Sequence, residues 1–159
     1  MNDAKDWERL GMKSEKEEEK VLDITPLKKA AEAYSNALTY IGKVESKKPE
    51  ERVFYEFEAA RAALIQHFEF SYELCWKFMK RFIEMDMGND ADIISRKDLF
   101  RISAGMRLIA DFDIWIKYTR DRNRTSHVYD EDVANEVFET AKRFFHEFRN
   151  FVETMEKRI

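Results

Sequence analysis

Apolar residues recur at helical spacing from near residue 27 onward. The first such residues step by four, three, four and three positions: Leu27, Ala31, Tyr34, Leu38 and Ile41. This stepping places apolar side chains along one narrow seam of a helix. Thr25 suits the N-cap position and Pro26 suits the first helical position. The pattern therefore predicts a helix over about residues 26–45.

The segment from about residue 50 to residue 86 is apolar on more than one side. Its main stripe includes Phe54, Phe57, Leu64, Ile65, Phe68, Tyr72, Cys75, Trp76, Met79 and Ile83. A second stripe holds Phe70, Leu74 and Phe78. A helix with two apolar sides is buried on two fronts. We expect one front to face the bundle and the other to be available to a second subunit.

Local capping signals predict two shorter helices. Ser95 with Asp98 three residues later resembles a capping box with a short acidic arm. The helix that begins there ends at Gly105 or after Ile109. The next helix is expected to start after Asp111.

A last helix is predicted over about residues 130–157, with an acidic first turn that suits the positive end of a helix dipole. The chain has only four glycines and two prolines, which argues for long helices and against sheets. Short connections between five helices favour an all-α antiparallel bundle. We expect residues 1–24 to form a charged N-terminal arm and residues 25–159 to form one bundle domain.

Composition narrows the setting of the protein. Cys75 is the only cysteine, so an intrachain disulfide is impossible, and its apolar surroundings favour a buried structural thiol. No signal peptide and no run of transmembrane length is evident, so we expect a cytoplasmic protein without membrane contact. The net charge of −4 excludes a general nucleic-acid coat. Any binding of phosphate or RNA must therefore use a local basic site.

One such basic site is present. Arg120, Arg122 and Arg124 fall within five residues, and His127 follows closely. Guanidinium groups bind phosphate oxygens through two parallel hydrogen bonds. Histidine moves protons near neutral pH. Together, an arginine and a histidine can cleave RNA without a metal or a cofactor, because histidine transfers protons and arginine stabilises the charge on phosphorus.

Helix geometry restricts how this site can be assembled. Residues five apart lie about 140° apart around an α-helix, so Arg122 and His127 do not share one face. Asn123 and His127, which are four apart, do share a face. Either the helix ends before His127 or the site combines residues of two chains. We favour a symmetric dimer, with distortion near Ser126 as an addition.

A simpler interpretation stands beside this one. Arginine-rich helical stretches are commonly solvated, and a histidine near a helix C-terminus commonly stabilises that terminus. His67 and His146 lie in amphipathic stretches without comparable neighbours and are interpreted as structural. No cluster of acidic residues or histidines has the spacing of a metal site.

The run from Arg122 to Tyr129 reads R-N-x-x-x-H-x-Y. It is similar to the R-x4-H-x-Y signature of HepT-like proteins, which belong to the HEPN superfamily of helical bundles. Residues 66–77 resemble the helix-two block of that family, and Leu108-Ile109, Trp115 and Asp130-Glu131 also fit. The resemblance covers about residues 25–157. The sequence departs from the family in its residues 1–24 and in lacking proline around Ser95.

The resemblance implies a five-helix bundle, a homodimer and a toxin–antitoxin pair. In such a pair the HEPN subunit is a metal-independent ribonuclease. A minimal nucleotidyltransferase antitoxin silences it by transferring AMP to the motif tyrosine. Carried over by position, the catalytic residues are Arg122 and His127, and the AMP acceptor is Tyr129.

The resemblance and the basic run together suggest further roles. Asn123 and Ser126 are expected to support the site, and Arg120 and Arg124 are expected to bind RNA phosphates. Two alternatives remain open. In the first alternative, the protein is a noncatalytic subunit that binds a nucleotide or substrate for its partner transferase. In the second, it is a purely structural helical dimer.

Overall fold

Five α-helices and two short 3-10 turns make up the computed structural model, which describes residues 21–88 and 95–159. Within those residues there is no strand. The elements are α1 (Thr25–Ser46), η2 (Pro49–Glu51), α2 (Glu56–Met87), α3 (Arg96–Gly105), α4 (Phe112–Arg124), η4 (Thr125–His127) and α5 (Glu131–Arg158). The predicted all-α bundle is confirmed. The predicted charged arm lies mostly outside the described residues.

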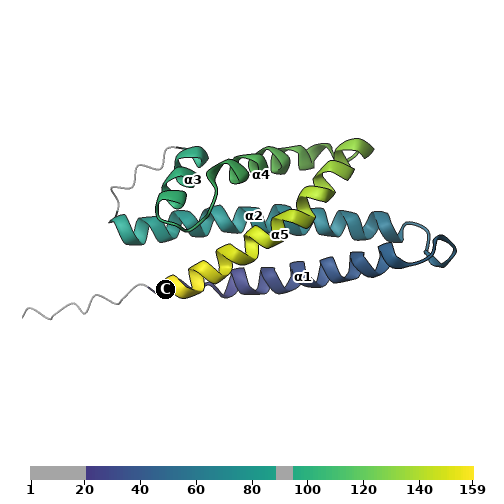
Figure 1. Cartoon of the computed structure of the whole chain (residues 1–159), viewed down its shortest axis with the longest axis horizontal. Coiled ribbons are helices and arrows are strands. Elements are labelled where there is room, and N and C mark those ends of the chain that lie inside the picture. The colour runs from purple at the N-terminus through teal and green to yellow at the C-terminus, as the bar shows by residue number, and fades with distance from the viewer. Residues whose placement is uncertain (1–20, 89–94) are drawn as a thin grey trace, which may run out of the picture.

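The long helix α2 is the central support of the bundle. Helix α1 runs antiparallel to it, and α3 and α4 lie on the other side of α2 (Figure 1). Helix α5 crosses and packs against α1, α2 and α4. The α1–α2 connection and the α4–α5 junction lie at the same end of the bundle. This arrangement brings the motif that starts at Arg122 close to the first half of α2.

Three of the predicted helix starts are confirmed by their caps. The Oγ of Ser95 accepts a hydrogen bond from the backbone N–H of Asp98 at 3.1 Å. Asp111 accepts from two backbone N–H groups of α4, the nearer at 2.8 Å. Asp130 does the same for α5, with the nearer N–H at 2.9 Å. Each cap is satisfied within three residues, which is why local sequence predicts it.

The N-cap predicted at Thr25 lies one residue earlier, at Ile24. Thr25 already lies inside α1, and the N-cap residue Ile24 has no side chain that can accept a hydrogen bond. The side chain of Asp23 instead accepts from the N–H of Thr25 at 2.9 Å. Pro26 stands in the first turn, as expected, because its missing N–H loses no helical hydrogen bond there.

The predicted start of α2 near residue 50 is wrong. A 3-10 turn occupies Pro49–Glu51, and α2 begins only at Glu56. Arg52 ends the 3-10 turn in extended backbone, and Tyr55, the N-cap residue of α2, has a φ of +65°. Left-handed backbone costs a residue with a Cβ roughly 1–2 kcal/mol. The apolar spacing alone does not show this interruption.

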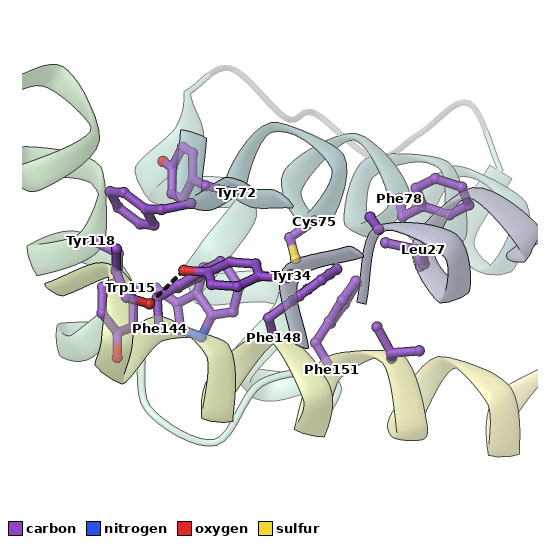
Figure 2. Close-up of a cluster of buried hydrophobic side chains, with 14 of the residues drawn as sticks. Leu27, Tyr34, Tyr72, Cys75, Phe78, Trp115, Tyr118, Phe144, Phe148 and Phe151 are labelled. Carbon is purple, nitrogen blue, oxygen red and sulfur yellow. Dashed lines mark hydrogen bonds between the residues drawn. The ribbon is translucent and has the colours of Figure 1, made fainter. Parts of the chain in front are cut away.

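Aromatic side chains fill the core (Figure 2). The ring of Phe144 packs against Tyr118 at 5.0 Å and against Trp115 at 5.6 Å between centroids. The hydroxyl of Tyr34 donates to the backbone carbonyl of Ala141. Burial raises the pKa of Tyr34 and raises that of Tyr118 to about 12. Both phenols are therefore neutral packing groups.

Cys75 is fully buried in this core, as predicted, and burial raises the pKa of its thiol. The second stripe of α2 divides between the core and the surface. Phe78 is buried, whereas Phe70 is 58% exposed. None of the described helices has the length and apolar character needed to cross a membrane.

Candidate functional site at the α4–α5 junction

Helix α4 ends at Arg124, and a 3-10 turn continues the chain to His127. Two hydroxyls turn back onto the helix at this point. Thr125 donates to the carbonyl of Arg122 at 2.7 Å, and Ser126 donates to that of Asn123 at 3.2 Å. The helix therefore ends before His127, which is the first of the two arrangements that the sequence left open.

Thr125 anchors this turn to the bundle. Its side chain is buried, and its hydroxyl also reaches the carboxylate of Glu69 on α2. The backbone N–H of Asp130 donates to the carbonyl of His127 at 3.0 Å and closes the connection to α5. The motif is thus presented on a short turn that is fixed at both ends.

Arg122 points toward α2 and lies between two carboxylates. Its Nη1 is 3.7 Å from Glu69 Oε1, and its Nε is 3.3 Å from Glu73 Oε1. The Nε atom is buried, and within the described residues it makes no hydrogen bond of good geometry. The contact with Glu73 is consequently an ion pair with a poorly aligned N–H. The positive charge of Arg122 is compensated while its hydrogen-bonding capacity is only partly used.

Glu73 connects several groups on this side of α2. Its Oε2 accepts from the indole N–H of Trp76 at 2.7 Å. Arg96 of α3 places a guanidinium nitrogen 4.0 Å from Glu73 Oε1 and stacks over the ring of Trp76 at 4.5 Å. The phenol of Tyr72 accepts from Arg96 at 3.4 Å. Two helices therefore hold the carboxylate that faces Arg122.

Sequence reasoning missed Glu69, Glu73 and Arg96. The available signal was the four-residue spacing of Glu69 and Glu73, which places both carboxylates on one face of α2. Both also lie inside the block of residues 66–77 that resembles the HepT-like family. Nothing local to that block indicates a pairing with Arg122.

His127 and Tyr129 form the exposed part of the site. The imidazole Nδ1 lies 3.3 Å from the Tyr129 hydroxyl, and the two rings meet edge to face with centroids 5.9 Å apart. Either atom can be the donor, depending on the tautomer of the imidazole. Tyr129 is 85% exposed. The hydroxyl of Tyr129 is therefore open to solvent and adjoins the imidazole of His127.

The structure does not join Arg122 to His127 in one chain. Among the described residues, the polar partners of the Arg122 side chain are Glu69, Glu73 and Thr125, whereas His127 contacts Tyr129. The guanidinium faces α2 and the imidazole lies beside the exposed tyrosine. Among the described residues, no hydrogen bond therefore links the arginine and the histidine that the sequence pairs.

The flanking arginines differ in availability. Arg124 pairs with Glu136 of α5 and lies 3.6 Å from Asp121, and the hydrogen bond with Glu136 raises its pKa. Arg120 is exposed and forms no ion pair within the described residues. Of the two predicted phosphate ligands, Arg120 is the one whose charge is free for a substrate. Asn123 also presents its side chain to solvent.

A shallow cavity of about 360 Å³ lies directly beside Arg122. It is lined by Gln66, Glu69, Phe70, Glu73, Leu74, Lys77 and Arg122. Phe70 and Leu74 are the outward residues of the second α2 stripe. The guanidinium therefore adjoins an exposed apolar surface, which is the combination expected where a second chain packs against the site.

A family model and a solved structure match most of the chain. A model of the family described as "Nucleotidyltransferase substrate binding protein like" matches residues 23–157. A Haemophilus influenzae protein named probable ribonuclease HepT is 38% identical over 99 residues, which span 61% of this chain and 68% of that protein.

Solved structures share the fold. One from Haemophilus influenzae, described as revealing the fold of a substrate-binding domain of a nucleotidyltransferase, superposes with a TM-score of 0.71 and 28% identity. The match covers 82% of this chain and 98% of the other. A Thermus thermophilus protein shares the fold with a TM-score of 0.57 and 21% identity, over 77% of this chain and 98% of its own.

Proposed function

The chain belongs to the family of nucleotidyltransferase substrate-binding-like proteins, and from this premise we propose that it is a cytoplasmic, metal-independent endoribonuclease of the HEPN type. It acts as the toxin of a toxin–antitoxin pair whose antitoxin is a minimal nucleotidyltransferase. The observation that carries the proposal is the anchored turn after Arg122, which presents His127 3.3 Å from the exposed hydroxyl of Tyr129. The similarity to a protein named probable ribonuclease HepT supports this assignment.

The proposed reaction uses only protein side chains. The 2′-oxygen of RNA attacks the adjacent phosphorus, and the bond from phosphorus to the 5′-oxygen breaks. The products are a 2′,3′-cyclic phosphate and a free 5′-hydroxyl. His127 transfers the protons, either by withdrawing that of the 2′-hydroxyl or by protonating the leaving oxygen. Arg122 stabilises the charge that develops on the phosphate oxygens.

A homodimer completes this site. No hydrogen bond joins Arg122 to His127 among the described residues, and the exposed ring of Phe70 lies beside Arg122 together with the half-buried Leu74. A two-fold axis through this face sets two copies of the motif against each other. A guanidinium of one chain and an imidazole of the other then act on one phosphate. Arg120 and Asn123 from α4 and Ser126 from the following turn support the substrate.

Modification of Tyr129 silences the enzyme in this proposal. The phenol oxygen attacks the α-phosphorus of ATP, pyrophosphate leaves, and the phenol loses its proton to His127 Nδ1 or to water. The attached AMP places a phosphodiester charge next to His127. That charge repels the RNA backbone, and the nucleoside occupies the space in front of the imidazole.

Cleavage of a mixed RNA substrate in EDTA tests the proposal. The wild-type chain is compared with His127→Ala and with the chain carrying AMP on Tyr129. We expect cleavage by the unmodified wild type only. Cleavage retained by His127→Ala contradicts the catalytic role, and circular dichroism of the variant shows whether its fold is intact.

A second function is favoured by the compensation of Arg122 by Glu69 and Glu73. In this alternative the subunit cuts nothing and binds a nucleotide for its partner transferase, with Arg122 exchanging a carboxylate for a phosphate. Saturable nucleotide binding that depends on Arg122, together with no RNA cleavage at high protein concentration, distinguishes it from the ribonuclease.

A further inference from the structure

Large apolar side chains are exposed to solvent at the turn that leads into α2. Val53, Phe54 and Tyr55 are 68%, 80% and 66% exposed. Tyr40 of α1 joins them, because its hydroxyl lies 3.4 Å from the carboxylate of Glu56. We call Tyr40, Val53, Phe54 and Tyr55 the aromatic tip. Clustered apolar exposure of this kind marks an interaction surface more often than an ordinary part of a protein surface.

The aromatic tip is held in one conformation. The N–H of Glu56 donates to the carbonyl of Val53 at 3.0 Å, and the N–H of Ala59 donates to that of Tyr55 at 3.0 Å. The carboxylate of Glu56 pairs with Lys47 at 2.7 Å and also accepts from the N–H of Val53. A preorganised surface loses little conformational entropy when a partner binds.

Tyr55 strains this conformation without a gain in packing. Its φ is +65°, a region that favours glycine, yet its ring is mostly in solvent beside that of Phe54. Residues held in such backbone conformations cluster at functional positions. The strain is explained if the ring is needed where it is, for a contact outside this chain.

The charges around the tip favour a protein partner over RNA. Residues 43–58 carry four cations and five carboxylates, a net charge of −1: Lys43, Lys47, Lys48, Arg52, Glu45, Glu50, Glu51, Glu56 and Glu58. Binding of single-stranded RNA requires a positively charged surface beside the stacking rings. Exposed aromatic anchors within a rim of mixed charges are instead typical of protein interfaces.

Val53, Phe54 and Tyr55 lie in the α1–α2 connection and Tyr129 lies in the α4–α5 junction, and these two connections are at the same end of the bundle (Figure 1). Arg61, six residues after Tyr55 and so about 9 Å further along α2, pairs through both guanidinium nitrogens with Glu131, at 2.7 and 3.1 Å. Glu131 follows Tyr129 by two residues. An ordinary protein interface covers about 800 Å² on each partner, a patch roughly 30 Å wide. One partner can therefore cover both the tip and Tyr129.

We propose that the aromatic tip is the docking surface for the nucleotidyltransferase that modifies Tyr129. This inference rests on the proposed function and adds where the transferase binds. Phe54 and Tyr55 insert into an apolar recess of the transferase, and the charged residues around them form the rim. The docked enzyme then has its active site over the exposed hydroxyl of Tyr129.

The test uses the 159-residue chain and a purified minimal nucleotidyltransferase, the partner class of the proposed function. The variants are Phe54→Ser and Tyr55→Gly, with Met87→Ser as control, because Met87 is 51% exposed at the opposite end of α2. Titration calorimetry gives Kd and thermal melting gives Tm. We expect each tip variant to weaken binding by about tenfold or more, and the control to bind as the wild type does.

Tyr55→Gly separates a binding role from a structural one. Glycine adopts positive φ without strain, so the Tm of this variant stays the same or rises while its affinity for the transferase falls. A fall in Tm with unchanged affinity shows that Tyr55 acts within the fold and overturns the proposal. So does wild-type affinity in both tip variants, or a tip change that alters only self-association or RNA cleavage.

Modification of Tyr129, followed by intact mass after addition of ATP and Mg²⁺, keeps the two proposals distinguishable. Binding that depends on the tip without modification of Tyr129 contradicts the proposed function and supports the docking surface. Modification with normal affinity in the tip variants supports the function and overturns the docking surface. A wild-type chain that fails to bind the transferase overturns the docking surface as well.

Discussion

The two halves of α4 have different roles in the same helix. Trp115 and Tyr118, in its first half, are buried among aromatic rings and contribute through contact area. Arg122, one turn after Tyr118, is held by carboxylates and lies at the edge of solvent. The first half fixes the position of the helix, and the second half presents charged and titratable groups from it. Stability and chemistry are therefore expected to depend on different residues only one or two turns apart.

The largest effect on folding is expected from Trp115→Ala. Removing this buried ring leaves a cavity beside Phe144 and lowers the free energy of unfolding by about 3–5 kcal/mol. Chemical denaturation measures the loss. Ser126→Ala, an exposed change on the turn after α4, is the control and should stay within about 0.5 kcal/mol of the wild type. Equal losses of unfolding free energy in both variants would show that stability does not depend mainly on the first half of α4.

His127→Gln is expected to reduce RNA cleavage and to leave stability unchanged. The exposed imidazole contributes little to packing, so the melting temperature is preserved, whereas RNA cleavage falls by about 10²–10⁴-fold because proton transfer is lost. Single-turnover cleavage rates with a defined RNA measure the effect. A variant that loses stability and activity together would indicate that His127 supports the turn rather than the reaction.

A smaller effect is expected at Glu73 of α2, which pairs with Arg122 in the second half of α4. The Arg122–Glu73 ion pair is partly exposed and is worth about 1 kcal/mol or less. Glu73→Gln frees the guanidinium for phosphate, so the KM for RNA is expected to fall by up to about fivefold while stability decreases slightly. Steady-state kinetics and denaturation measure the two effects. Complete loss of cleavage would instead place Glu73 in the reaction itself.

Sequence could predict the features that are fixed by residues close together in the chain. The caps at Ser95, Asp111 and Asp130 follow from hydrogen bonds closed within three residues, so local patterns suffice. The motif from Arg122 to Tyr129 is likewise contiguous. Its environment is not, because Glu69 and Glu73 reach Arg122 across about fifty residues of chain.

Two other features escaped prediction for related reasons. The left-handed conformation of Tyr55 is supported by an ion pair between Lys47 and Glu56, which no apolar spacing records. Phe70 lies exposed and Phe78 lies buried although both belong to the same apolar stripe of α2. Periodicity shows that a residue is apolar and on which stripe it lies, but packing of distant helices decides whether it is covered.

The smallest expected effect concerns His67 of α2, whose side chain packs toward the aromatic core. Its ring packs near Tyr34 at 5.9 Å, and burial lowers its pKa below the ordinary 6.5. The unfolded chain therefore takes up this proton at a higher pH than the folded chain does. The free energy of unfolding is expected to fall as pH drops below about 6.5 and to level off below the folded pKa.

His67→Asn removes this titration, so the difference in stability between wild type and variant should shrink or reverse between pH 7.5 and 5.5. Denaturation at both pH values measures it, and subtracting the two chains cancels the carboxylates that they share. A difference that stays constant with pH would mean that the imidazole of His67 remains as accessible to protons in the folded chain as in the unfolded one. The imidazole of His67 would then lie outside the core that the neighbouring buried aromatic residues form.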